Sequence, residues 1–132
     1  MVTGVGTDLL KISRLSPETL REDDPFFKST YTARESAQAR ERDDPRMYCA
    51  TRFAGKEAVF KALGIPADGV RLNEIEILAA PDGHPVVTLH GKVRAMADAR
   101  GICQILLSLS YDTEYAVAYA IAQDNDAVPR EQ

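Results

Sequence analysis

The sequence is poor in cysteine and has no long hydrophobic run, and each shortage excludes a class of protein. Its 132 residues include only two cysteines, Cys49 and Cys103. Two are too few for a disulfide framework and lack metal-site spacing, so both read as small buried residues of a reduced, intracellular protein. No apolar run is long enough to cross a bilayer, and residues 1–4 do not resemble a signal peptide. These features predict a cytoplasmic protein without a membrane partner.

A basic excess and several catalytic motifs are also missing. The net charge of −4 argues against nucleic-acid binding, for which a basic stripe is expected. The Walker string Gly-x-x-x-x-Gly-Lys-Ser/Thr and the protein-kinase motifs do not occur. His84 and His90 belong to no Ser-His-Asp or Cys-His arrangement, and we interpret them as solvated polar residues.

The order of secondary-structure signals indicates one α+β domain with a largely antiparallel sheet packed on helices. We expect the domain to span residues 1–122 and the polar tail, 123–132, to be disordered. Residues 11–25 read as a loop with a short helix. A Thr-x-x-Glu capping box and an Asp-Asp-Pro break mark two helix starts. Helices are predicted at 32–42, 45–63 and 91–101, and strands at 1–10, 73–78, 85–90, 104–110 and 114–122.

The helix over 52–64 carries charges that do not gather on one face. At about 100° per residue, Glu57 shares a stripe with Lys61, and Arg52 shares another with Lys56. The remaining side has only small residues: Ala54, Gly55, Ala58 and Ala62. Such a side lets a helix lie close to another element, so much of this helix should be buried. Glu57 then needs a partner, and an ordinary salt bridge to Lys61 is the alternative to a functional role.

The amino-terminal strand presents a second unusual pattern. Its period of two places Gly4, Gly6 and Asp8 on one face. Glycine within a strand marks the close approach of a ligand or another backbone, so Asp8 resembles a ligand beside a cleared space. The alternative is that the glycines form a bulge and that Asp8 caps the segment that follows.

One carboxylate on the strand and one on the helix, Asp8 and Glu57, form a sparse oxygen set. Such a set suits Mg²⁺, which keeps waters and takes its remaining ligands from substrate phosphates. Arg52, Lys56 and Lys61 would then neutralise phosphate oxygens, the arginine as a fork and the lysines as point charges. The residues therefore point to phosphoryl-type transfer.

Three segments together resemble the holo-acyl-carrier-protein synthases, the short phosphopantetheinyl transferases. They are 4–14, 52–64, and 108–111 with 115–118, in the order found in that family. The resemblance implies an α+β homotrimer with active sites at subunit interfaces. It also implies Mg²⁺-dependent transfer of the phosphopantetheine arm of coenzyme A to a serine of an acyl carrier protein.

The resemblance also implies roles for individual residues. Asp8 and Glu57 would hold the metal, and Lys61 would assist the leaving adenosine bisphosphate, so these three form the expected catalytic set. Coenzyme A would contact Arg52, Lys61, Gly64, Gly83, Pro85, Ser110 and Tyr111, with Gly83 and Pro85 against the adenine. Arg14 would face the acidic carrier protein together with Arg21, although neighbouring acids could equally pair with Arg21.

Three positions depart from the family pattern. Tyr111 stands where the family has a phosphate-contacting His, and a phenol donates a hydrogen bond but supplies no cation. Phe60 replaces a small polar residue and Gly55 replaces Ala; we interpret both as packing changes, although Phe60 could narrow the site.

The leading hypothesis is therefore a Mg²⁺-dependent holo-acyl-carrier-protein synthase serving fatty-acid or polyketide biosynthesis. Its general base stays open between Glu57, a water held by Asp8, and another group. A second hypothesis is a non-catalytic homologue that only binds coenzyme A or a carrier protein. A third is a structural oligomer whose salt-bridge helix is incidental.

Overall fold

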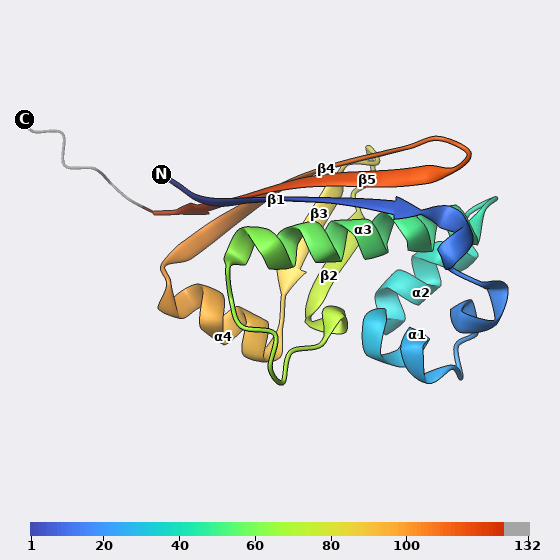
Figure 1. Ribbon diagram of the computed structural model, residues 1–132, viewed down its shortest axis with the longest axis horizontal. Coiled ribbons are helices and arrows are strands. Elements are labelled where there is room, and N and C mark those ends of the chain that lie inside the picture. Colours follow the sequence, from blue (N-terminus) through green and yellow to red (C-terminus); the bar gives the residue numbers. More distant parts are fainter. Residues whose placement is uncertain (126–132) are drawn as a thin grey trace, which may run out of the picture.

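The computed structural model describes residues 1–125 (Figure 1). Its α-helices are α1 (Pro25–Thr30), α2 (Ala33–Arg40), α3 (Pro45–Leu63) and α4 (Gly91–Ala99). Its strands are β1 (Val2–Lys11), β2 (Ile75–Ala79), β3 (Pro85–Leu89), β4 (Ile102–Tyr111) and β5 (Tyr115–Asp124). Short 3-10 helices cover Ile12–Arg14, Pro17–Leu20 and Leu72–Glu74. The predicted α+β class is confirmed.

Two antiparallel sheets pack around the long helix α3. One has the strand order β1-β5-β4, and the other is the hairpin β2-β3. The three-stranded sheet lies along one side of α3, while α1, α2 and α4 lie on the other (Figure 1). The alanines at every second position of β5 are fully or almost fully buried against the helix: Ala116, Ala118, Ala120 and Ala122. The core therefore lies between α3 and the two sheets.

The two glycines of β1 allow the backbone of α3 to approach, not a ligand. A Cβ atom at Gly4 would lie 2.1 Å from the Ala62 carbonyl oxygen, and one at Gly6 would lie 2.0 Å from that of Ala58. No side chain fits in either place, so glycine is required at both. The space beside Asp8 that the strand pattern suggested is filled by the helix.

The small side of α3 is packed as its sequence predicts. Ala54 and Ala58 are fully buried, and a Cβ atom at Gly55 would lie 2.7 Å from Cδ1 of Ile77. Packing thus accounts for glycine at position 55, where the family pattern has Ala, because Ile77 occupies the space that a Cβ atom would need. Phe60 is partly buried against the same core.

Helix ends follow the local sequence signals. Thr32 and Glu35 form the predicted capping box of α2, and the Asp44 side chain accepts from the Met47 amide at the start of α3. Gly64 ends α3 with φ of 64°, a left-handed conformation that suits glycine. The capping and stop signals therefore placed these ends to within about two residues.

Some expectations need correction. The stretch 11–25, expected to be a loop with a short helix, contains two short 3-10 helices, and helix α1, which was not expected, begins at its end. Strand β5 continues through Asp124, whose amide donates to the Met1 carbonyl at 2.9 Å. The strand therefore runs past its expected end at residue 122. The rest of the predicted tail, 126–132, lies outside the described residues. Cys49 is buried, but Cys103 is exposed, contrary to its interpretation as a buried residue. Within residues 1–125, no helix is long and apolar enough to cross a membrane.

Candidate active site

Asp8, Glu57 and Lys61 come together where the middle of β1 lies on α3. The Lys61 Nζ atom is 3.3 Å from Asp8 Oδ1 and donates to the Thr7 carbonyl at 3.1 Å. Lys61 therefore extends across to the strand, and forms no ion pair with Glu57 in the described chain. The ordinary salt bridge along the helix, considered as an alternative, is absent there.

Glu57 is held in an unfavourable electrostatic position. Burial raises the pKa of its carboxyl group, the negative charge of Asp8 raises it further, and Lys61 only partly opposes them. The Asp8 side chain is 17% exposed while Lys61 is 52% exposed, so the cation lies toward solvent and the acids lie deeper. One partly solvated lysine thus pairs with Asp8 and only partly offsets the charge of Glu57.

This donor set fits a hard divalent cation. A cation between Asp8 and Glu57 would remove their repulsion, and two carboxylates with open positions suit Mg²⁺ better than an all-protein cage would. Within residues 1–125, no group of three or more His, Cys, Asp or Glu side chains is placed to hold a metal. A metal at this pair would therefore need water or substrate oxygens to complete its coordination.

Three residues expected to bind coenzyme A line one cavity of about 470 Å³: Arg52, Gly83 and Tyr111. Arg42, Asp44 and Tyr48 line it as well. Helix α3, the β2-β3 turn and the end of β4 each supply part of the wall. The structure thus brings together two expected site residues, Arg52 and Tyr111, that are 59 positions apart in the sequence.

Arg52 is held firmly in the wall of this cavity. Its Cζ lies 3.8 Å from the centroid of the Tyr48 ring, its Nε donates to the Ile77 carbonyl at 3.4 Å, and its Nη1 donates to Thr51 Oγ1 at 3.1 Å. The residue is 8% exposed, and burial lowers the pKa of its guanidinium group. A bound anion would offset that desolvation cost.

Lys56 does not lie in the site, contrary to the expectation that it neutralises phosphate. It is fully buried, and its Nζ donates to Glu35 Oε1 at 2.7 Å and to the carbonyls of Leu72 and Ile75 at 3.1 and 2.6 Å. Three acceptors satisfy all three of its donors. Lys56 is therefore a structural residue that joins α3 to α2 and β2.

The other expected site residues lie at or near the surface. Gly64 ends α3 and accepts from Arg100 at 2.9 Å, Pro85 begins β3 opposite Ala79, and Ser110 is exposed beside Tyr111 on β4.

The two arginines expected to face a carrier protein differ in their surroundings. Arg14 ends the 3-10 helix after β1 and is exposed. Arg21 is also exposed, and its Nε lies 3.6 Å from Asp23 Oδ1. Local pairing, the alternative use of Arg21, is thus observed.

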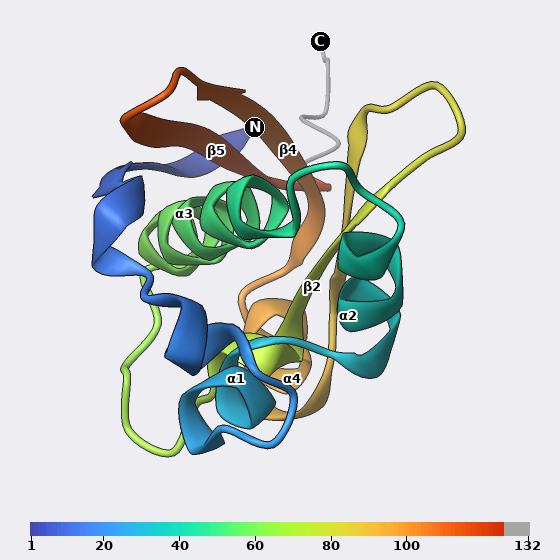
Figure 2. The ribbon, with the colours of Figure 1, turned by 90° about the vertical axis from the view of Figure 1, so that its right-hand side faces the viewer.

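Asp8 and Glu57, which we call the acidic cluster, and the cavity lined by Arg52, which we call the Arg52 cavity, lie on different sides of α3. Arg52 and Glu57 are five residues apart, which separates them by about 140° around a helix. Arg52 contacts β2, whereas Glu57 lies near Asp8 of β1; in Figure 2, α3 lies between these strands. Within one described chain, the candidate site is therefore in two parts.

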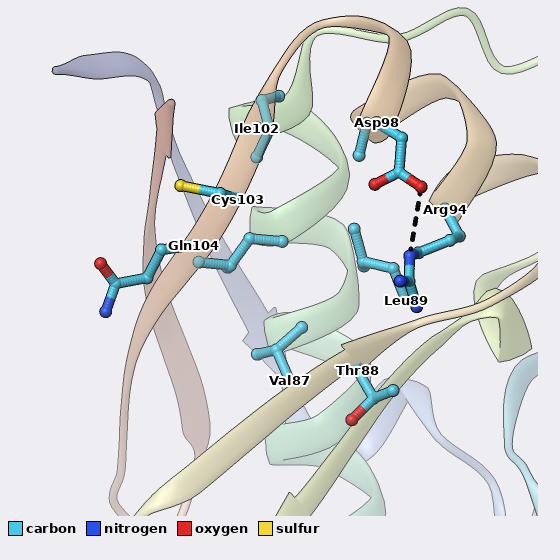
Figure 3. A pocket seen from close by; sticks show the side chains of 10 residues that line it. Val87, Thr88, Leu89, Arg94, Asp98, Ile102, Cys103 and Gln104 are labelled. Carbon is cyan, nitrogen blue, oxygen red and sulfur yellow. Dashed lines mark hydrogen bonds and ion pairs between the residues drawn. The ribbon is translucent and has the colours of Figure 1, made fainter. Parts of the chain in front are cut away.

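Another groove, of about 410 Å³, lies between β3, α4 and β4 (Figure 3). Val87, Leu89 and Ile105 are among its lining residues, and the Arg94–Asp98 ion pair, at 3.3 Å, lies on its helical side. None of the residues predicted for the site line it. We therefore place the candidate site at the acidic cluster and the Arg52 cavity.

Sequence reasoning missed three residues around Arg52. Tyr48 lies one helical turn before Arg52, and that i, i+4 spacing could have identified it. Glu35 was assigned only to the capping box, and Gln38 was not singled out. Their contacts with β2 join residues some 40 positions apart, and no local pattern predicts such contacts.

Comparison with known proteins places this fold and site in a class. Residues 4–120 match the 4'-phosphopantetheinyl transferase superfamily, which covers all of the site residues described above. The chain belongs to this superfamily.

Individual relatives define the class more closely. The holo-[acyl-carrier-protein] synthase of Desulforudis audaxviator is 40% identical over 122 residues, 92% of this chain and 93% of the relative. The crystal structure of that enzyme from Neisseria meningitidis has a TM-score of 0.81 at 28% identity, covering 94% of this chain and all of the other. The ACPS of Chronobacterium ammoniagenes, solved as a complex with CoA, has a TM-score of 0.79 at 29% identity, covering 92% and 97%.

Proposed function

We propose that this chain transfers the phosphopantetheine arm of coenzyme A to a serine of an apo acyl carrier protein. The observation that carries the proposal is the under-neutralised pair Asp8 and Glu57 at the meeting of β1 and α3, in a chain that matches the superfamily over residues 4–120. The carrier serves fatty-acid or polyketide biosynthesis, a part of lipid metabolism, and the enzyme works in the cytoplasm.

Asp8 and Glu57 hold Mg²⁺ in this proposal. The metal, when bound, supplies positive charge to the phosphate oxygens of the donor substrate. The Lys61 side chain, which is half exposed, leaves Asp8 and donates to a phosphate oxygen of the leaving group. The protein thus contributes mainly position and charge, as is general in phosphoryl-type transfer.

The serine proton needs an acceptor near the acidic pair. Glu57 is a candidate, because burial and Asp8 raise the pKa of its carboxyl group and so favour proton uptake. A water held by Asp8 is a second candidate, and another group is a third. If Glu57 is the base, Glu57→Gln removes proton transfer as well as a metal ligand. If the water is the base, Glu57→Gln removes only the metal ligand.

The coenzyme A nucleotide occupies the Arg52 cavity. The buried guanidinium of Arg52 donates to a phosphate oxygen, and the β2-β3 turn, with Gly83 and Pro85, lies against the adenine. Ser110, Tyr111 and Gly64 contact the same ligand. The cavity volume of about 470 Å³ is within the usual range for small-molecule sites.

A homotrimer with interfacial active sites would unite the two parts of the site. The outer face of the β1-β5-β4 sheet supports this assembly, because three successive cross-strand rows on it contain no charged residue. In register, these rows are Val5, Ile121 and Leu106; Thr7, Tyr119 and Ser108; Leu9, Val117 and Ser110. Val5 is 69% exposed and Tyr119 is 62% exposed, so large apolar side chains face solvent on this face of an isolated chain. Partner subunits cover this face and bring one chain's acidic cluster to another's Arg52 cavity.

The acidic carrier protein docks on Arg14, with Arg21 as a weaker contact because Asp23 already pairs with it. Arg14 is exposed one turn after the strand that carries Asp8. Its position is therefore compatible with delivering the carrier serine to the acidic cluster.

One observation favours a second candidate, a homologue that binds coenzyme A or a carrier without transferring the arm. Tyr111 is 62% exposed in the same cavity as Arg52, so a neutral phenol stands where a cation would strengthen phosphate binding. Intact-mass measurement of several apo carrier proteins, incubated with coenzyme A and Mg²⁺, separates the candidates. Transfer adds one phosphopantetheine group per carrier, whereas a binding-only homologue leaves every carrier mass unchanged.

A further inference from the structure

Strand β2 has one edge paired with β3, and its other edge is satisfied by side chains from α2 and α3. The Ile77 amide donates to Glu35 Oε2 at 2.6 Å, while the Ile77 carbonyl accepts from Arg52 Nε at 3.4 Å. Both backbone groups of one residue thus bind side chains instead of a neighbouring strand. Glu35 and Arg52 are thus linked through one residue, Ile77.

The next position on this edge is bound in the same way. Gln38 accepts from the Ala79 amide at 2.8 Å and donates to the Ala79 carbonyl at 3.1 Å. The same side-chain oxygen of Gln38 accepts from the Tyr48 hydroxyl. Since the Tyr48 ring lies under the Arg52 guanidinium, Gln38 fixes both the strand beside Arg52 and the ring beneath it.

Helix α2, which lies beside β2 (Figure 2), therefore reaches Arg52 by two routes. One passes from Glu35 through Ile77, and the other from Gln38 through Tyr48. Neither residue lines the Arg52 cavity. We propose that Glu35 and Gln38 are positioning residues, which hold the Arg52 guanidinium in the orientation that binds a coenzyme A phosphate.

This inference rests on the proposed function, because it takes Arg52 as a phosphate ligand. Glu35 is a poor first test, since its loss would leave the buried Lys56 charge without a counter-ion and endanger folding. Gln38 is half-buried and uncharged, so Gln38→Leu removes the contacts with less risk. Tyr48→Phe is a second variant, because it deletes the hydroxyl that donates to Gln38 and keeps the ring beneath the Arg52 guanidinium.

The test is a double-mutant cycle with Arg52→Ala, measured as coenzyme A affinity by calorimetry in Mg²⁺ buffer, without carrier protein. In the Arg52 background, Gln38→Leu should weaken binding about tenfold, the loss expected when one charge-assisted contact is disordered. In the Arg52→Ala background it should have no further effect. Tyr48→Phe should show the same coupling with a smaller change.

Val93→Ala is the control, because Val93 is fully buried on α4 and its backbone amide donates to Glu74, which belongs to neither route. It should lower stability while leaving coenzyme A affinity unchanged, which separates positioning from general loosening. Equal effects of Gln38→Leu in both backgrounds, or unchanged affinity in the first, would overturn the inference. Wild-type affinity in Arg52→Ala would overturn it as well by removing Arg52 as a ligand. Failure of the proposed function is a separate result: the wild-type chain would then modify no carrier.

Discussion

Helix α3 carries two lysine–carboxylate groups that are handled in opposite ways. At Lys56, one cation meets one carboxylate and two carbonyls, and both charged side chains are fully buried. At Lys61, one half-exposed cation serves Asp8, and Glu57 is left with a raised pKa because of burial and the Asp8 charge. The first group is complete without a ligand, whereas the second has an excess of negative charge. A charged cluster therefore indicates function where the fold leaves its charges unbalanced.

The largest effect is expected from removing an acid from the group formed by Asp8, Glu57 and Lys61. We expect Asp8→Asn or Glu57→Gln to lower transfer on the order of 10³-fold, because each change removes one of two hard-oxygen ligands. Thermal unfolding should stay close to wild type, since neither carboxylate neutralises a buried cation. Transfer near the wild-type rate, or an unfolded variant, would contradict the assignment of these acids.

The converse change, in the balanced group, should affect folding. Lys56→Met leaves Glu35 as an unpaired buried carboxylate, and we expect a loss of about 3–5 kcal/mol in the free energy of unfolding. Lys61→Met is the matched surface change and should cost less than about 1 kcal/mol. Urea denaturation of both variants measures the difference. Similar losses in the free energy of unfolding for the two variants would contradict the view that the buried Lys56 is structural and the half-exposed Lys61 is not.

The two cysteines give the same contrast between buried and exposed groups. Burial raises the pKa of Cys49 to about 11, so at pH 8 the thiolate fraction of Cys49 is about 10⁻³. We expect iodoacetamide at pH 8 to label exposed Cys103 at least about a hundredfold faster than Cys49. Labelling of Cys49 should accelerate as the pH rises toward that pKa, or on unfolding in urea. Peptide mass mapping over time distinguishes the sites, and equal rates in the folded protein would refute the burial of Cys49.

The smallest expected effect concerns Tyr111 in the Arg52 cavity. Tyr111→His should tighten coenzyme A binding about three- to tenfold at pH 6 and less at pH 8, because imidazole is charged mainly below its ordinary pKa of about 6.5. High salt should weaken the gain at this exposed position. Calorimetry at both pH values measures it, with Tyr111→Phe as an uncharged control. If affinity is unchanged at both pH values, Tyr111 does not face phosphate.

The sequence predicted most of the fold because its signals are local. The capping box at Thr32, the Pro45 start of α3 and the turn at Gly83 each depend on residues within about four positions of one another. The stretch between β1 and α2 was harder, because short helices such as α1 have weak local signals and are stabilised mainly by packing.

The candidate site was predictable only in part. Asp8, Glu57 and Lys61 follow from strand and helix periodicity, and the structure brings them together. The assignment of Lys56 to phosphate was wrong because its partners, Glu35 and the Ile75 carbonyl, come from other elements. On a helix wheel, Lys56 and Lys61 are equally good phosphate ligands. Only tertiary contacts show which of them is already neutralised.

Metal dependence tests the central claim most directly. Transfer to an apo carrier protein, followed by intact mass, should stop when a chelator removes divalent cations and return when Mg²⁺ or Mn²⁺ is added. This result would support Asp8 and Glu57 as the charges that the fold leaves for a metal. Full transfer in chelator, or recovery with zinc alone, would contradict the account.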